Sequence, residues 1–129
     1  MAEIVLDASA LLAMIQGEPG GDKVARLLLD PEPSVYVSTL NWSEVFDRLL
    51  RSGIPEETIE PLLGRLGLEI IDFNLEQARL AAVYRLSAPA LSLADRACLA
   101  LAATLKATAW TADKAWARVK VGVDVEVLR

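Results

Sequence analysis

The chain alternates short runs of consecutive apolar residues with longer stretches in which apolar residues recur every three or four positions. Short continuous runs are typical of strands buried on both faces, as in a parallel sheet, and the longer stretches are typical of helices that bury one face. The pattern predicts strands at residues 4–6, 35–37, 68–71, 108–110 and 123–127. It predicts helices at residues 10–15, 22–29, 43–51, 55–66, 74–86, 93–106 and 114–118.

Turn and cap residues separate these segments. Gly17 stops the first helix, Pro31 and Pro33 end the second, and Asn74 is expected to cap the fifth. No repeat, linker or low-complexity segment interrupts the alternation, so residues 1–129 are expected to form a single α/β domain. Alternating strands and helices predict a parallel sheet with helices on both faces. Such sheets bind ligands beyond the carboxyl ends of their strands.

Composition narrows the possible chemistry. A length of 129 residues suits one domain, and an apolar content of 53% excludes a disordered chain. The absence of histidine excludes Ser-His-Asp triads, Cys-His dyads and histidine-bound zinc, which leaves carboxylate, metal, hydroxyl or lysine chemistry. The single cysteine, Cys98, excludes an internal disulfide and fits a reducing cytoplasm, the expected location. Neither a membrane span nor a basic secretory leader is expected.

The charge of the chain limits how it can hold a nucleic acid. Thirteen basic and 18 acidic side chains give a net charge of −5. Proteins that bind nucleic acid by bulk electrostatics are normally basic. Any nucleic acid must therefore be held through a local patch of cations or through bound metal ions.

Four carboxylates occupy corresponding places in the predicted elements. Asp7 follows the first strand, Asp113 follows the fourth, Glu44 lies in the first turn after the second strand, and Asp95 lies in the first turn of a helix capped by Ser92. Each therefore lies at the end of the sheet where a ligand is expected. The alternative is structural, because the helix dipole favours an acid in a first turn and Ser92 and Asp95 also make a capping pair.

The surroundings of these acids differ. Asp7 lies in an apolar run without a cation nearby, and Asp95 has only the adjacent Arg96, whereas Glu44 has Arg48 four residues on and could form a surface ion pair. Poorly paired acids that converge in a desolvated cleft must take up protons or bind a hard cation. An oxygen-only set of ligands fits Mg²⁺ or Mn²⁺.

Two hydroxyls accompany the acids. Ser9 follows Asp7 by two residues and Thr111 precedes Asp113 by two. Two interpretations stay open: Ser9 caps the following helix and Thr111 ends a strand, or both orient carboxylates or a metal-bound water.

The acids lie in four motifs that span almost the whole chain: VLDASALL (5–12), NWSEV (41–45), LSLADRACLALA (91–102) and TADKAWA (111–117). In this order they resemble the PIN-domain ribonucleases and, within them, the VapC toxins of bacterial toxin–antitoxin pairs. The resemblance implies a three-layer α/β/α sandwich with a five-stranded parallel sheet and Mg²⁺- or Mn²⁺-dependent endoribonuclease activity. It carries the family's acidic cluster onto Asp7, Glu44, Asp95 and Asp113, and its accessory hydroxyls onto Ser9 and Thr111.

The resemblance also suggests roles and partners. Asp7 and Asp95 are the first choice as direct metal ligands, with Glu44 and Asp113 completing the cluster directly or through water. A metal-activated water would leave 5′-phosphate and 3′-hydroxyl products. A homodimer and a small DNA-binding, VapB-like antitoxin are expected to cover the apolar helices between residues 43 and 66. The candidates for holding the RNA backbone, or else simply solvated cations, are Arg96, Lys114 and Arg118.

Other interpretations are weaker. Two departures from the PIN pattern, Ala94 in place of glycine and Trp110 in place of a smaller residue, affect local packing rather than the acids. A receiver domain would need an acidic pair after the first strand, and a haloacid-dehalogenase-type phosphatase would need aspartate at Ser9. A PIN ribonuclease with a housekeeping role and a catalytically idle PIN binding module remain as alternatives. Cys98, Trp42 and Trp116 are expected to pack in the core, although either tryptophan could stack a base.

Overall fold

The computed structural model describes residues 2–129. Five strands form one sheet, in which every neighbouring pair is parallel. The order is β3-β2-β1-β4-β5. The strands are β1 (Glu3–Leu6), β2 (Ser34–Ser38), β3 (Glu69–Ile71), β4 (Thr108–Thr111) and β5 (Val125–Val127). The chain builds outward from β1 on one side and then crosses to β4 on the other, so the topological switch point lies between β1 and β4.

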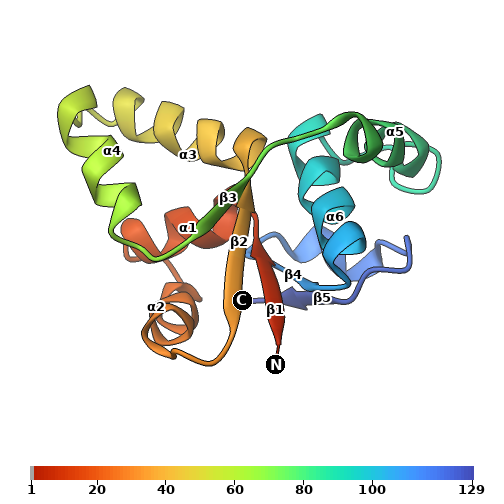
Figure 1. Ribbon diagram of the computed structural model, residues 1–129, viewed down its shortest axis with the longest axis horizontal. Helices are drawn as coiled ribbons and strands as arrows, with labels where there is room; N and C mark the ends of the chain where they lie inside the picture. The colour runs from red at the N-terminus through yellow and green to blue at the C-terminus, as the bar shows by residue number, and fades with distance from the viewer. Residues whose placement is uncertain (1) are drawn as a thin grey trace.

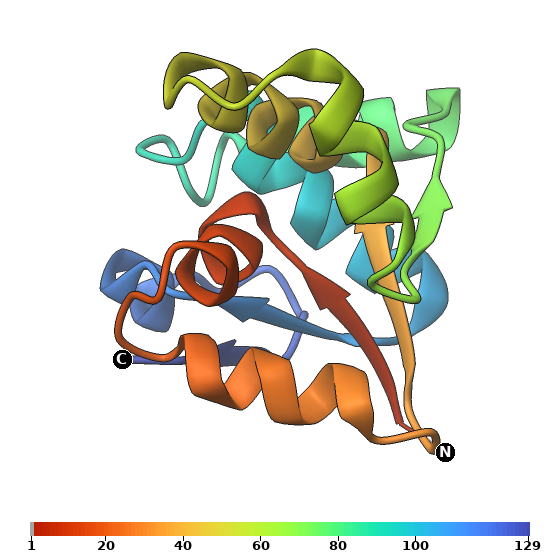
Figure 2. The same ribbon diagram turned by 90° about the vertical axis from the view of Figure 1, so that its left-hand side faces the viewer.

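Helices cover both faces of the sheet (Figure 1). On one face lie α1 (Ala8–Ile15), α2 (Gly21–Leu29), α3 (Thr39–Arg51) and α4 (Glu56–Gly64). On the other lie α5 (Leu75–Tyr84), α6 (Leu93–Leu105) and the 3₁₀ helix η1 (Lys114–Arg118). Figure 2 shows the first face, with α1 and α2 in front of the strands. The predicted three-layer α/β/α sandwich with a five-stranded parallel sheet is confirmed.

The alternation of side chains along β1 explains the two cores. Ile4 and Leu6 pack with α1–α4, while Val5 packs with α5 and α6. All three are buried, as expected for a strand covered on both faces. Cys98 and Trp116 are fully buried in the second core, which confirms their interpretation as packing residues.

Helix α3 begins earlier than the sequence pattern predicts. Ser38 caps it, accepting a hydrogen bond from the backbone N–H of Leu40 at 3.3 Å. The predicted start at residue 43 is therefore wrong, and Glu44 lies in the second helical turn rather than the first turn after the strand. The error arose because no apolar stripe marks residues 39–42, where Asn41 is nonetheless fully buried.

Smaller shifts affect other elements. Helix α1 begins at Ala8 rather than residue 10, because Asp7 itself is the cap. Pro55 precedes α4 as its cap rather than opening it. Within residues 2–129, no helix is long and apolar enough to cross a membrane.

Candidate active site

Asp7 lies at the carboxyl end of β1, next to the switch point, and both of its carboxylate oxygens are engaged. Oδ1 accepts hydrogen bonds from the Ser9 hydroxyl at 2.7 Å and from the Ala10 N–H at 2.8 Å. Oδ2 accepts one from the Thr111 hydroxyl at 2.5 Å. The side chain is only 2% exposed. The fold therefore holds this carboxylate in one position.

Burial makes the charge on Asp7 costly. Desolvation raises the pKa of its carboxyl to about 6, against the opposing effect of the hydrogen bonds from Thr111, Ala10 and Ser9, and the negative charge of Asp95 adds slightly to the increase. Within residues 2–129 no lysine or arginine forms an ion pair with Asp7. A buried, unpaired carboxylate of this kind is stabilised by a proton or by a metal ion.

The two hydroxyls connect Asp7 to the loop that carries Asp113. Ser9 Oγ also accepts a hydrogen bond from the Ala112 N–H at 2.9 Å, and Thr111 Oγ1 accepts one from the Asp113 N–H at 3.1 Å. The two hydroxyl oxygens lie 3.2 Å apart. Because Asp7 rather than Ser9 caps α1, the interpretation of Ser9 as a helix cap is wrong.

Asp95 forms a capping box with Ser92, as the structural interpretation of this pair predicted. The Ser92 N–H donates to Asp95 Oδ2, and the Asp95 N–H donates to Ser92 Oγ, both at 3.1 Å. Among the described residues no group donates a hydrogen bond to Asp95 Oδ1. Partial burial raises the pKa of this carboxyl and the hydrogen bonds with Ser92 lower it, while the charge of Asp113 raises it and that of the adjacent Arg96 lowers it. The cap therefore fixes the carboxylate and leaves one oxygen open to a ligand.

Glu44 is held by an amide that the sequence analysis did not single out. The Asn41 side-chain amide donates to Glu44 Oε1 at 3.2 Å and to the Ala94 carbonyl at 3.1 Å. Asn41 thereby links α3 to the residue just before Asp95. Burial raises the pKa of Glu44, the hydrogen bond from Asn41 lowers it, and Asp95 raises it.

The ion pair considered for Glu44 does not form. The salt bridges within residues 2–129 join Asp22 to Arg26, Asp47 to Arg51 and Glu18 to Arg129. Glu44 instead takes its hydrogen bond from Asn41, one helical turn earlier. The sequence does contain a signal for this hydrogen bond: Asn41 and Glu44 are three residues apart, so they lie on the same helix face.

Asp113 follows the end of β4 by two residues and caps η1. Its Oδ1 accepts a hydrogen bond from the Ala115 N–H at 2.9 Å, and the side chain is exposed. The carboxylate therefore lies at the outer edge of the site, at the end of the strand that pairs with β1.

Asp95 is the electrostatic centre of the four acids. Its charge raises the pKa values of Asp7 and Glu44, and the charge of Asp113 raises its own. The buried Cys98 thiol, one helical turn after Asp95, also has its pKa raised, first by burial and then by Asp7, Asp95 and Glu44. Four acids contributed by α3, α6 and the ends of β1 and β4 thus share one electrostatic environment.

The acids do not close around a single point. Within residues 2–129, no group of three or more cysteine, aspartate or glutamate side chains is arranged so that it could hold a metal ion as it stands. The donors nevertheless suit Mg²⁺ or Mn²⁺, since all are oxygens and each of the four carboxylates keeps at least one oxygen with a free lone pair. The side chains offer the chemistry of a hard-cation site with open positions rather than a closed cage.

The family model of the PIN domain matches residues 4–122. The chain belongs to the PIN domain family. No curated protein matches it by sequence. Its fold is similar to that of solved toxin–antitoxin structures. The sequence identities are low, so the similarity shows a shared fold and nothing further.

Three of these structures illustrate the similarity to the PIN domain. VapBC2 from Rickettsia felis, bound to a promoter DNA fragment, is 17% identical with a TM-score of 0.76, and the match covers 98% of this chain and 99% of that chain. DNA-bound VapBC from Salmonella typhimurium is 16% identical, with a TM-score of 0.76 and all of both chains covered. The sarcin-ricin loop cleaving toxin VapC20 from Mycobacterium tuberculosis is 17% identical, with a TM-score of 0.71 and coverage of 88% and 92%.

The structure corrects one expectation for RNA contacts in this PIN domain. Arg96 is only 8% exposed, and its guanidinium donates to the carbonyls of Ala81 at 2.7 Å and Leu91 at 3.3 Å. It stabilises the interior and does not face solvent, so it is no longer a candidate for holding RNA. Lys114 and Arg118 are exposed and form no ion pair within the described part of the chain.

Proposed function

We propose that this PIN domain is an Mg²⁺- or Mn²⁺-dependent endoribonuclease that acts as the toxin of a toxin–antitoxin pair. The observation that carries the proposal is the grouping of four acids around Asp95: its charge raises the pKa values of Asp7 and Glu44, and the charge of Asp113 raises its own. No ion pair neutralises any of the four within residues 2–129. Such a set is unfavourable without a cation and lies at the switch point of the sheet, where parallel α/β folds bind ligands.

Asp7 and Asp95 are the residues that would hold the metal directly, with Glu44 and Asp113 completing the set directly or through water. When bound, a divalent cation supplies neutralisation of phosphate charge and lowers the pKa of a coordinated water. Ser9 and Thr111 orient Asp7 by hydrogen bonding, and Asn41 orients Glu44. The chain has no histidine, and Asp7, Glu44 and Asp95 have raised pKa values, so these carboxyls are the candidates for proton transfer at the site.

The toxin assignment rests on the similar structures, which are described as toxins or toxin–antitoxin complexes. An antitoxin or a second copy of the chain would have apolar surface available, since Leu50, Leu62 and Ile70 expose about two fifths of their side chains on α3, α4 and β3. A VapB-like antitoxin with a basic segment would also complement the acidic site. RNA and such a partner would be met in the cytoplasm.

The test of the enzymatic proposal is cleavage of single-stranded RNA by the purified protein. We expect cleavage with Mg²⁺ or Mn²⁺, none in EDTA, and products with a 5′-phosphate. Asp95→Asn should abolish cleavage, while the matched control Asp47→Asn, an exposed acid paired with Arg51, should leave it unchanged. RNA binding without cleavage under any metal would instead favour an idle PIN module.

A growth assay separates a toxin from a housekeeping ribonuclease. Expression of the wild-type chain should arrest growth, and expression of Asp95→Asn should not. Cleavage in vitro with no effect on growth would contradict the toxin assignment and leave the ribonuclease assignment intact.

A further inference from the structure

A hollow of about 470 Å³ lies between the loop at residues 87–91 and η1. Its volume falls in the range of roughly 300–1,000 Å³ that is usual for small-ligand pockets. Pro89, Ala90, Ala115 and Val119 line it with accessible apolar surface, whereas Ala88 and Leu91, which also line it, are only 6% and 7% exposed. No acidic residue lines it. The hollow is therefore suited to a largely apolar group.

The loop that forms one wall is fixed by buried hydrogen bonds. The Leu91 N–H donates to the Ala88 carbonyl at 3.1 Å, and the Ala88 N–H donates to the Tyr84 carbonyl at 2.9 Å. Arg96, buried beneath, donates to the carbonyls of Leu91 and Ala81 and so ties this loop to the end of α5. The buried Arg96 side chain therefore holds this wall of the hollow in place.

The opposite wall is also preformed. Trp116, in the middle of η1, is fully buried in the core. Asp113 caps the start of η1 through the Ala115 N–H. Both walls are thus already ordered before a ligand enters the hollow. This lowers the free-energy cost of binding.

Each wall lies close in the chain to one of the four acids. Leu91 is followed by Ser92, which forms the capping box with Asp95. Lys114, which lines the other wall, directly follows Asp113. The hollow is thus adjacent in the chain, on both sides, to the acids of the candidate active site.

The charge of the hollow is opposite to that of the acids. Lys114 and Arg118 both line it, both are exposed, and neither forms an ion pair within residues 2–129. In a chain with a net charge of −5, two unpaired cations beside an apolar hollow form a local site for an anionic, partly apolar ligand. A nucleotide matches both features, since its phosphate is anionic and its base presents an apolar face.

We propose that this hollow is a nucleobase subsite for single-stranded RNA. It holds the base of one nucleotide next to the cut phosphate, while Lys114 and Arg118 contact the flanking backbone. The inference rests on the proposed ribonuclease function and adds a determinant of sequence preference to it. The base lies against Pro89, Ala115 and Val119, so the subsite selects by the size and shape of the base rather than by charge.

The test uses variants that fill the hollow from either wall. Ala115→Phe fills it from η1 and Ala90→Trp from the loop, and both positions are exposed, so at least one is expected to fold. Wild-type protein with Mn²⁺ should cut an RNA with randomised positions at sites that share a base preference at one position beside the cut. Both variants should weaken that preference and raise KM about tenfold, the factor for losing burial of roughly 60 Å² of apolar surface.

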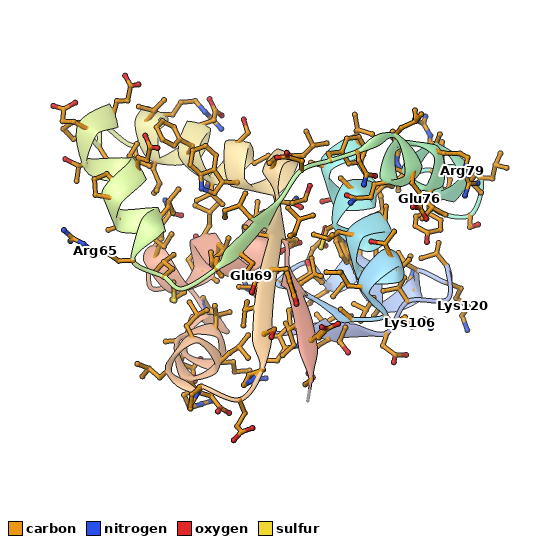
Figure 3. The ribbon with its side chains drawn as sticks, in the orientation of Figure 1. Arg65, Glu69, Glu76, Arg79, Lys106 and Lys120 are labelled. Carbon is orange, nitrogen blue, oxygen red and sulfur yellow. The ribbon has the colours of Figure 1, made fainter. Side chains whose placement is uncertain are left out.

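The cations and their controls complete the design. Lys114→Ala and Arg118→Ala should each weaken RNA binding and reduce the salt dependence of binding by about 0.7 in log–log slope, the value for one phosphate of a single strand. Lys120→Ala, close in sequence but outside the hollow, and Arg65→Ala, at the end of α4 on the opposite side of the molecule (Figure 3), should change neither quantity.

Binding is also measured in the Asp95→Asn background by fluorescence anisotropy of a labelled RNA, so that the subsite is assessed without cleavage. If wild type cuts no RNA, the proposed function fails, and the subsite stands only if Ala115→Phe and Ala90→Trp still weaken binding there. If wild type cuts RNA but neither variant alters binding, KM or base preference, the subsite is overturned and the hollow is left to a protein partner.

Discussion

The Thr111 hydroxyl donates a hydrogen bond to Asp7 Oδ2 at 2.5 Å, between residues 104 positions apart in the chain. The same hydroxyl oxygen accepts a hydrogen bond from the Asp113 N–H. One side chain therefore joins the end of β1 to the loop after β4 across the switch point. Its hydrogen bond also lowers the pKa of Asp7, against the increase caused by burial, because a hydrogen bond to a carboxylate favours the charged form.

Thr111→Val tests this connection, since valine keeps the shape and removes the hydroxyl. We expect the pKa of Asp7 to rise further and RNA cleavage to fall by about 10–100-fold, the usual effect of losing a group that orients a metal ligand. Carboxyl NMR titration and initial rates measure the two effects. Thr104→Val is the matched control, because the Thr104 hydroxyl only donates to the Leu101 carbonyl on α6. Equal activity in both variants would contradict the orienting role.

The raised pKa of Asp7 predicts an unusual dependence of stability on pH. A carboxyl with a pKa of about 6 in the folded chain and 3.8 as its ordinary value binds more protons when folded between those two pH values. The free energy of unfolding should therefore fall as pH rises from about 4 to 6, by on the order of 3 kcal/mol from Asp7 alone, and then level off. Denaturant titrations in EDTA between pH 4.5 and 7.5 measure this.

Asp7→Asn should remove most of that decrease and stabilise the fold at pH 7, because asparagine also caps helices and carries no charge. The same variant should abolish cleavage. A pH dependence equal to that of wild type would show that another group titrates.

A divalent metal should offset the cost of the acidic site. Mg²⁺ or Mn²⁺ should raise the Tm of wild type, with a stabilisation of about 2.7 kcal/mol when the free ion exceeds its Kd about a hundredfold. The shift should be smaller in Asp7→Asn and Asp95→Asn and unchanged in Asp47→Asn. Differential scanning calorimetry with and without EDTA measures it, and equal shifts in all four proteins would place the ion elsewhere.

The sequence predicted the sheet and the order of the acids because both depend on local signals. Continuous apolar runs such as residues 4–6 mark strands buried on both faces, and an acid that follows such a run lies at the carboxyl edge of a parallel sheet. The place of Asp7 and Asp113 followed from that rule and needed no knowledge of tertiary contacts.

Asn41 and Arg96 show where local signals fail. Asn41 is buried because its amide reaches Ala94 in a different helix, a contact between residues 53 positions apart. Arg96 is buried because carbonyls of Ala81 and Leu91 face it. In both cases the partner is a backbone carbonyl, which every residue has, so no residue type in the sequence could indicate the pairing.

The burial of Arg96 makes it a determinant of stability. Arg96→Met keeps the length of the side chain but leaves the Ala81 and Leu91 carbonyls without their donor. An unsatisfied buried carbonyl costs about 1–3 kcal/mol, so we expect the free energy of unfolding to fall by at least that amount. Urea denaturation measures it, and Arg79→Met, exposed on α5 (Figure 3), is the control. An unchanged midpoint would contradict a structural role.

Asn41 is predicted to set the titration of Glu44. Its amide hydrogen bond favours the glutamate carboxylate, so Asn41→Ala should raise the pKa of Glu44 and shift the acidic limb of the pH–rate profile to higher pH. Carboxyl NMR titration detects the change even in the absence of RNA. Asn74→Ala is the matched control, because Asn74 only caps α5 through the Gln77 N–H.

The control should lose about 1 kcal/mol of stability, with no change in the titration of Glu44. A purely structural role for Asn41 would make the two variants alike: both would be less stable, and Glu44 would titrate as in wild type. A shift confined to Asn41→Ala would instead identify the Asn41 amide as the group that keeps Glu44 ionised beside Asp95.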